Sequence, residues 1–197
     1  MLIVGITGRS GSGKSTALEA IKSLGGLALD CDAIYHELLR SDCSLKNELN
    51  QHFPGVLKEN AIDRKRLGDI VFNSPDALLK LNEITHKYVK AEVRRRLQDW
   101  DSEGGALAAI DAIALIESGI DGLCDIVIGI IAPKELCIQR ITGRDGISPD
   151  KAMRRLNAQK EERYFEDNCD YVVHNTADTP NGFIAEIKKI IGGHTAK

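Results

Sequence analysis

The 197-residue chain lacks the features of a membrane protein and of a dedicated nucleic-acid binder. No apolar run approaches the roughly 20 residues that a membrane-spanning helix needs. The opening segment, MLIVGITG, has no basic stretch ahead of a signal-peptide core. Lys and Arg total 26 against 29 Asp and Glu, so the net charge is −3, without the basic excess of nucleic-acid surfaces. We expect a cytoplasmic protein whose partners are neither membranes nor nucleic acids.

Cysteine is sparse and shows neither a disulfide framework nor a metal-site pattern. The five cysteines are an odd number, form no Cys-x-x-Cys pair and have no histidines at zinc-ligand spacing. We expect reduced thiols, most of them buried. A chain of this length buries roughly 70% of its unfolded surface and needs no covalent staple. The cysteines are Cys31, Cys43, Cys124, Cys137 and Cys169.

Short apolar runs alternate with helical patterns along most of the chain. Such alternation predicts right-handed βαβ units, and hence an α/β fold whose parallel sheet has helices on both faces. Between the second and third strands, about 65 residues contain no convincing strand and predict a helical insertion. The last helix is expected at 180–191, with Thr179 as its N-cap. The five predicted strands are 2–6, 27–29, 106–110, 126–131 and 171–173.

The first strand leads into GRSGSGKS, which fits the phosphate-binding loop G-x-x-x-x-G-K-[ST]. Glycines let the chain turn tightly, so that backbone N–H groups reach phosphate oxygens. The following helix adds unpaired N–H groups and its positive dipole end. Lys14 would lie near the β- and γ-phosphates, and the Ser15 hydroxyl would bind Mg²⁺. The expected nucleotide-binding residues of this loop are Gly8, Gly11, Ser12, Gly13, Lys14, Ser15 and Thr16.

The loop indicates a nucleoside triphosphate, but it does not define a reaction. A GTPase commonly recognises guanine through an Asn-Lys-x-Asp segment. The chain contains no such segment, which argues against a GTPase. A small kinase needs an acceptor site, and ligands in open α/β sheets bind at the carboxyl ends of strands. Asp32 follows the second strand and could accept or orient the proton of an acceptor hydroxyl. Its structural alternative is to cap the helix expected from Ala33, while Asp30 is better explained structurally.

A basic segment between two predicted helices resembles the lid of a kinase. Its glycines and Pro149 mark a loop within 142–149, and arginine forks match phosphate geometry. Closure of such a lid over ATP would exclude water. For any single arginine, surface solubility is the alternative. The arginines are Arg140, Arg144, Arg154 and Arg155.

These motifs together resemble the dephospho-coenzyme A kinase family over nearly the whole chain. The similar segments are ITG at 6–8 through Thr16, DCD at 30–32, IDR at 62–64 with Leu67 and Phe72, His86, Arg140, RDG at 144–146, RLNAQ at 155–159 and DYVVHN at 170–175. Two positions depart from the family pattern. Lys87 follows His86 where the family has Pro, and Ile113 stands where its Pro-Leu-Leu-Phe-Glu segment begins.

The resemblance implies a P-loop kinase with a three-layer fold and strand order 2-3-1-4-5. The core would be 1–32 and 104–197, with a CoA-binding helical insertion at 33–103 and a lid at 140–160. It also implies transfer from ATP, with Mg²⁺, to the ribose 3′-hydroxyl of dephospho-CoA, the last step of CoA biosynthesis. The catalytic residues would be Asp32, Lys14 and Arg140. Arg144 and Asn175 would make further contacts with ATP. The acceptor would be bound by Thr7, Asp32 and His86.

Two alternatives remain open at this point. One is another small-molecule or nucleoside monophosphate kinase of the P-loop class. The other is a non-catalytic, nucleotide-dependent binding module, which would bind ATP without acceptor-dependent release of ADP. A panel of acceptors separates the three.

Overall fold

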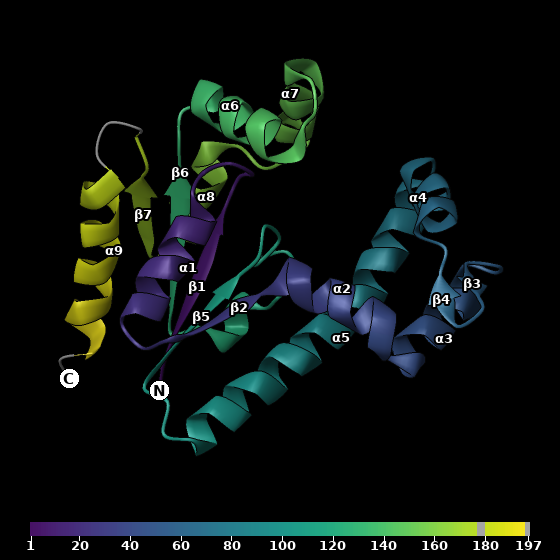
Figure 1. Ribbon diagram of the computed structural model, residues 1–197, viewed down its shortest axis with the longest axis horizontal. Helices are drawn as coiled ribbons and strands as arrows, with labels where there is room; N and C mark the ends of the chain where they lie inside the picture. The colour runs from purple at the N-terminus through teal and green to yellow at the C-terminus, as the bar shows by residue number, and fades with distance from the viewer. Residues whose placement is uncertain (177–179, 196–197) are drawn as a thin grey trace. The chain divides into compact units, whose positions relative to one another are not determined.

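The computed structural model describes residues 1–176 and 180–195 and divides the chain into two compact units (Figure 1). The first unit comprises Met1–Leu29 and Trp100–Lys197, and the second comprises Asp30–Asp99. The helical insertion expected from the sequence is 33–103. Its assignment to acceptor binding stays a prediction.

A five-stranded sheet forms the first unit, in the order β2-β5-β1-β6-β7. The central strand β1 pairs in parallel with β5 and β6, and β6 pairs in parallel with β7. Because β3 and β4 belong to the second unit, this order is the predicted 2-3-1-4-5 of the core strands. The strands are β1 (Leu2–Gly8), β2 (Leu27–Asp30), β5 (Leu107–Asp111), β6 (Ile126–Ile131) and β7 (Tyr171–His174).

Helices cover both faces of this sheet, which confirms the three-layer prediction. On one face, Ile128 and Ile130 of β6 lie in a buried cluster with residues of α1 (Lys14–Ser23) and α9 (Pro180–Thr195). Gly129 lies between them and faces the other way. A Cβ there would lie 3.1 Å from Phe165 of α8 (Glu162–Asn168). Thr179, the predicted N-cap of α9, lies outside the described residues.

Two packed helices, α6 (Lys134–Asp145) and α7 (Pro149–Asn157), occupy the segment expected to be a lid. The turn between them is shorter than predicted. Gly143 lies inside α6, since one helical glycine costs only about 1 kcal/mol. Gly146, with φ 64°, ends the helix instead. The buried residues that pack here are Ala132, Cys137, Ile141, Ala152 and Leu156.

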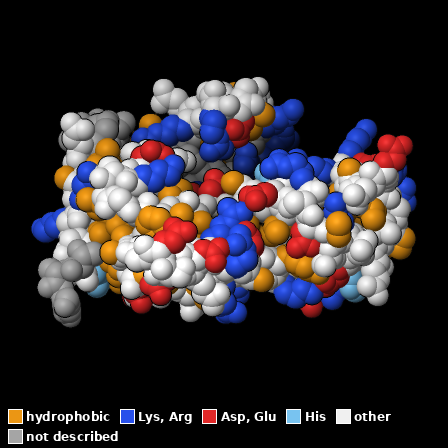
Figure 2. Space-filling model, turned by 60° about the horizontal axis from the view of Figure 1, so that its bottom comes forward, with side chains coloured by type: hydrophobic (Ala, Val, Ile, Leu, Met, Phe, Trp, Pro, Cys, Tyr) orange, Lys and Arg blue, Asp and Glu red, His pale blue; other side chains and the backbone are white. Residues whose placement is uncertain are grey.

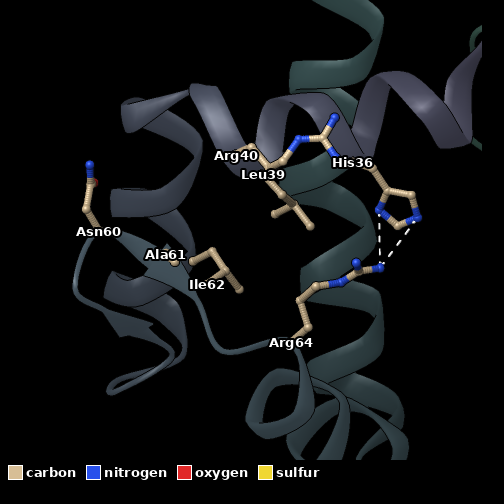
Figure 3. Close-up of a pocket in the computed structure, with 7 residues that line it drawn as sticks. All are labelled: His36, Leu39, Arg40, Asn60, Ala61, Ile62 and Arg64. Atoms are coloured by element: carbon tan, nitrogen blue, oxygen red, sulfur yellow. Dashed lines mark hydrogen bonds between the residues drawn. The ribbon is translucent and has the colours of Figure 1, made fainter.

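The second unit is mainly helical but contains a small hairpin that the sequence analysis did not predict. Its strands, β3 (Leu57–Lys58) and β4 (Ala61–Ile62), have two residues each, too few to show an alternating pattern. Glu59 and Asn60 form the turn with φ of 47° and 64°, the left-handed conformation of two-residue hairpin turns. The hairpin lies beside α2 (Figure 3). The helices are α2 (Cys31–Ser41), α3 (Cys43–His52), α4 (Arg64–Phe72) and α5 (Pro75–Ser102).

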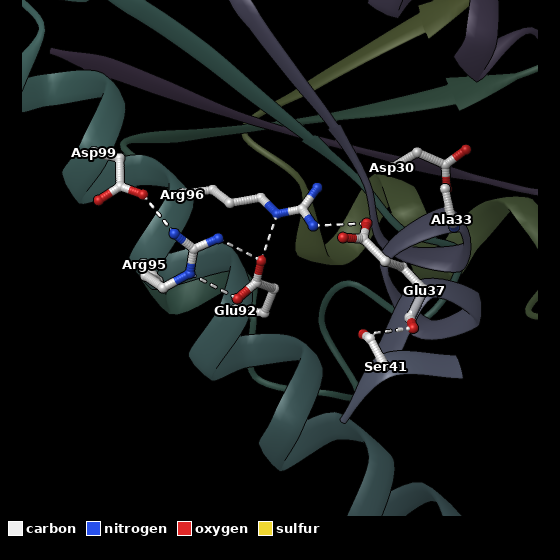
Figure 4. Close-up of polar contacts among 8 residues, drawn as sticks. All are labelled: Asp30, Ala33, Glu37, Ser41, Glu92, Arg95, Arg96 and Asp99. Carbon is white, nitrogen blue, oxygen red and sulfur yellow. Dashed lines mark hydrogen bonds and ion pairs between the residues drawn. The ribbon is translucent and has the colours of Figure 1, made fainter. Parts of the chain in front are cut away.

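A charged network joins α5 to α2 within this unit (Figure 4). Glu92 accepts hydrogen bonds from Arg95 at 2.8 and 2.9 Å and from Arg96 at 2.7 Å. Arg96 also donates to Glu37 of α2 at 2.7 Å. The Arg95 guanidinium and, after it, that of Arg96 lower the pKa of Glu92 to about 2. Glu92 is therefore ionised in the folded unit at neutral pH.

The five cysteines are free, but fewer are buried than we expected. Cys31 and Cys137 are buried, Cys124 and Cys169 are intermediate, and Cys43 is exposed. Burial raises the pKa of Cys124 to about 12 and that of Cys169 to about 11. The expectation of mostly buried thiols is wrong because Cys124 and Cys169 are only partly buried and Cys43 begins α3 at the surface.

Charges of both signs are interleaved on the face shown in Figure 2. This distribution accompanies a net charge of only −3. Within the described residues, no helix is both long enough and apolar enough to cross a membrane.

Glu92→Gln should make the free energy of unfolding depend less on pH in the acid range. A lowered folded-state pKa gives stability that is present above the unfolded value of 4.5 and is lost as pH falls toward 2. Because the network is partly exposed, we expect a cost of about 1 kcal/mol at pH 7. Urea unfolding between pH 2 and 7 measures both effects. Glu103→Gln, at an exposed carboxylate, is the control, and an equal pH profile for both variants would contradict the assignment.

Candidate functional site

The loop between β1 and α1 has a backbone that only glycine adopts readily. Gly8, Gly11 and Gly13 have φ of 145°, 79° and 111°. A Cβ at Gly11 would lie 2.7 Å from the Cys137 carbonyl oxygen, and one at Gly13 would collide with Asn175 Nδ2. Gly13 is the N-cap of α1 and provides no side-chain cap. The helix N-terminus thus faces the loop with its N–H groups uncapped, as an anion site requires.

Side chains from distant segments hold the carbonyl groups of this loop. Arg140 Nη1 donates to the carbonyls of Gly11 at 3.0 Å and Ser12 at 3.4 Å. Asn175 Nδ2 donates to Ser12 at 2.7 Å, and Asn175 is only 5% exposed. Lys14 Nζ donates to the Gly8 carbonyl at 3.1 Å. The carbonyls of Gly8, Gly11 and Ser12 are thereby bound, while two N–H groups of the loop, those of Ser10 and Ser12, also donate within the chain.

A pocket of about 220 Å³ opens beside this loop. Within the described chain, the N–H groups of its P-loop residues donate no hydrogen bond. Three cations line the pocket and no carboxylate does, so its chemistry suits the phosphates of a nucleotide. The lining residues are Gly11, Gly13, Lys14, Ser15, Thr16, Arg140 and Arg144.

Arg140 and Arg144 differ in their surroundings, although both line the pocket. Arg140 is held against the loop, whereas Arg144 pairs with Asp145 at 2.7 Å. Asp145 also forms an ion pair with Arg155, whose Nη1 lies 2.7 Å from Asp145 Oδ2. Arg144 and then Arg155 lower the pKa of Asp145. A phosphate bound by Arg144 would therefore share this guanidinium with a carboxylate.

A second set of hydrogen bonds holds the loop and involves residues for which the sequence predicted no role. Gln159 Oε1 accepts from Ser10 N at 2.9 Å, and its Nε2 donates to Ser10 Oγ at 2.8 Å. Arg9 Nη2 donates to the Leu156 carbonyl at 2.7 Å. These partners are almost 150 positions apart, so no local pattern could pair them. The end of α7 is thereby fastened directly to the phosphate-binding loop.

Ser15, the residue predicted to bind Mg²⁺, lines the same pocket. Mg²⁺ prefers oxygen ligands and keeps several waters, so one hydroxyl with nucleotide phosphates is a sufficient donor set. Among the described residues, no group of three or more His, Cys, Asp or Glu could hold a metal by itself. The residues present fit a magnesium ion that arrives with its nucleotide.

Thr7, predicted to bind the acceptor, lies at the end of β1. It is 1% exposed, and its hydroxyl donates to the Ile113 carbonyl at 3.2 Å. The departure from the family pattern at Ile113 therefore coincides with a backbone carbonyl that holds Thr7. A direct role of Thr7 toward the acceptor stays a prediction.

Asp32 and His86 belong to the second unit, apart from the residues around the loop. Asp30 caps α2 by accepting Ala33 N at 3.0 Å, so the capping role considered for Asp32 belongs to Asp30. Asp32 lies in the first turn, is exposed and has no hydrogen bond or ion pair within the described chain. A role of Asp32 toward an acceptor hydroxyl stays a prediction.

His86 lies half-buried on α5. The next residue, Lys87, replaces the proline of the family pattern and pairs with Glu48 of α3 at 2.7 Å. The departure thus supplies a contact between two helices of the unit. A role of His86 in acceptor binding stays a prediction.

Gly13→Ala should weaken the binding of nucleoside triphosphates. Alanine at positive φ costs roughly 1–2 kcal/mol, and its methyl group collides with Asn175, so the loop must distort. We expect ATP affinity to fall at least tenfold, as measured by titration calorimetry. Gly143→Ala is the control, because nothing lies within 4 Å of a Cβ there. Retained ATP affinity in Gly13→Ala would contradict the role assigned to this backbone.

Comparison with known proteins identifies the family of this chain. The dephospho-CoA kinase family model matches residues 2–181. The dephospho-CoA kinase of Dehalococcoides mccartyi is 35% identical over 161 residues, which cover 81% of each chain. The solved dephospho-CoA kinase from Campylobacter jejuni has 31% identity and a TM-score of 0.69, with 98% of this chain and 97% of that chain covered.

A more distant likeness concerns the fold alone. The shikimate kinase from Acinetobacter baumannii has 19% identity and a TM-score of 0.58, and the match covers 100% of this chain and 96% of that chain. The family match and the dephospho-CoA kinase relatives, in contrast, span most of the sequence, and the family match includes the phosphate-binding loop. The chain therefore belongs to the dephospho-CoA kinase family.

Proposed function

We propose that this protein transfers the γ-phosphoryl group of ATP to the ribose 3′-hydroxyl of dephospho-CoA and releases ADP and CoA. This reaction completes CoA biosynthesis. Membership of the family supports the acceptor. The single structural observation that carries the donor half is the pocket of unused loop N–H groups beside Lys14 and Arg140.

The donor half of the reaction rests on charge placement. In phosphoryl transfer, negative charge spreads over the oxygens of the moving group, so catalysis consists mainly of positioning and electrostatic stabilisation. Loop N–H groups and the α1 N-terminus would hold the phosphates. Lys14 would donate to the β- and γ-phosphates, and Arg140 would neutralise charge on the transferred group. Mg²⁺ held through Ser15 would supply further neutralisation.

Further residues of the core would complete the ATP site. Arg144 would bind phosphate in competition with Asp145. Asn175 would act on the nucleotide through the Ser12 carbonyl that it holds. The α6–α7 pair would serve as the lid that excludes water, so that ATP is not hydrolysed.

The acceptor half would depend on the second unit. Asp32 would accept a hydrogen bond from the ribose hydroxyl, and so align it or take its proton as the bond to phosphorus forms. His86 would contact the acceptor from α5, and Thr7 would act from the core. We also place the protein in the cytoplasm, where ATP and the acceptor are available.

A coupled assay of ADP release, with and without dephospho-CoA, tests the function. We expect release that depends on dephospho-CoA and not on AMP, dTMP or shikimate, with phosphorus NMR placing the new phosphate on the 3′ oxygen. Release with one of the other acceptors would favour a different small-molecule kinase. ATP binding without acceptor-dependent release would favour a binding module.

Asp32→Asn should lower kcat by roughly 10²- to 10⁴-fold, because the amide cannot accept the proton of the hydroxyl. The KM for ATP should stay within about twofold, since Asp32 does not line the phosphate pocket. Asp30→Asn is the matched control, because asparagine caps a helix as well as aspartate. Normal turnover in Asp32→Asn would remove this carboxylate from the mechanism.

A further inference from the structure

One face of α2 carries a series of polar residues that begins at Asp32. His36 and Arg40 follow at intervals of four residues, and so lie on the same side of the helix as Asp32. Each interval advances about 6 Å along the axis. Whatever meets Asp32 can therefore extend along this face toward Arg40.

The face leads to a pocket of about 230 Å³ within the second unit (Figure 3). Residues of α2, of the unpredicted hairpin and of the α4 N-terminus line it. Leu39 and Ile62 are its buried apolar part, and three residues supply side-chain nitrogens capable of carrying positive charge. The lining residues are His36, Leu39, Arg40, Asn60, Ala61, Ile62 and Arg64.

The positive charge of this pocket is not compensated within the described chain. Neither Arg40 nor Arg64 forms an ion pair there, and the partner of Arg64 is instead the His36 ring, with Nη2 at 3.3 Å from Nδ1. Asp63 is adjacent to Arg64 in sequence, but its two oxygens are engaged by Arg66 N and Lys58 Nζ. Two arginines at one pocket without a carboxylate partner attract an anion.

A buried lysine adds to the same field. Lys46 is 2% exposed, and its Nζ donates to the carbonyls of Arg40 at 3.2 Å and Asn60 at 3.1 Å, both residues of the pocket. An ammonium group has three N–H donors, and no carboxylate pairs with this one within the described chain. Asp42, four positions earlier, instead caps α3 through Leu45 N. A charge removed from water acts over a longer range than an exposed one.

We propose that this pocket binds the 5′-diphosphate of the acceptor nucleotide, with Arg40 and Arg64 as its ligands. In a nucleoside 5′-diphosphate ester, the ribose separates the 3′-hydroxyl from the phosphates. A diphosphate near Arg40 and Arg64 therefore leaves the hydroxyl toward Asp32, along the same face of α2. The apolar residues Leu39 and Ile62 suit the uncharged pantetheine chain that continues beyond the diphosphate. The inference rests on the proposed function and adds a specificity site to it.

Arg40→Gln and Arg64→Gln test the proposal, measured as KM for dephospho-CoA and KM for ATP in the coupled assay. Each removes one charge-assisted contact, so we expect the KM for dephospho-CoA to rise about tenfold or more. The KM for ATP should stay within about twofold. Both side chains are exposed, so thermal unfolding should be nearly unchanged and shows that the variants fold. Direct titration of dephospho-CoA without ATP gives an independent measure of the same loss.

Lys65→Gln is the matched control, since it removes the same charge from the residue next to Arg64 without altering the pocket. A KM for dephospho-CoA within twofold of normal in both arginine variants would overturn the proposal. An equal rise in the Lys65 variant would also overturn it, as a general effect of net charge. If the unaltered protein fails to phosphorylate dephospho-CoA, the proposed function itself fails, whatever the variants do.

Discussion

The function of the phosphate-binding loop depends on how its carbonyl groups are held. Each peptide unit carries a donor and an acceptor, so a loop that turns its N–H groups toward phosphate still needs partners for its carbonyl groups. Arg140 and Asn175 provide this support from segments more than 120 positions away. Gln159 adds a bond to Ser10 at the start of the loop. The strand order β2-β5-β1-β6-β7 matters because β6, which precedes Arg140, lies beside β1, and β7, which precedes Asn175, lies beside β6.

The parts of the structure that could be predicted are those with a local signal. The buried strands and the glycine loop follow from apolar runs, from alternation with helices and from a motif whose residue types have a physical purpose. The strand order, in contrast, was expected from the resemblance to a known family. The hairpin at 57–62 was missed because two-residue strands have no periodicity. The turn after α6 was placed too early because a glycine within a helix and one that ends it look alike in sequence.

The candidate site shows the same division between local and distant information. The motif predicts roles for Lys14, Ser15 and Thr16, and the place of Asp32 after a strand predicts a role for it; these roles stay predictions. The contact of Gln159 with Ser10 could not be predicted, since it depends on the tertiary path of the chain. The structure also reassigned the helix cap to Asp30, because the helix begins two residues earlier than its apolar pattern indicates.

The distribution of thiols has a practical consequence for labelling. Only the thiolate reacts readily with alkylating reagents, and burial keeps Cys124, Cys137 and Cys169 protonated well above neutral pH. Cys43 is the exposed thiol, and it begins α3 of the second unit, far in sequence from the loop that holds phosphate. A maleimide dye should therefore attach there first. The unaltered chain thus provides its own position for a fluorescent reporter on the second unit.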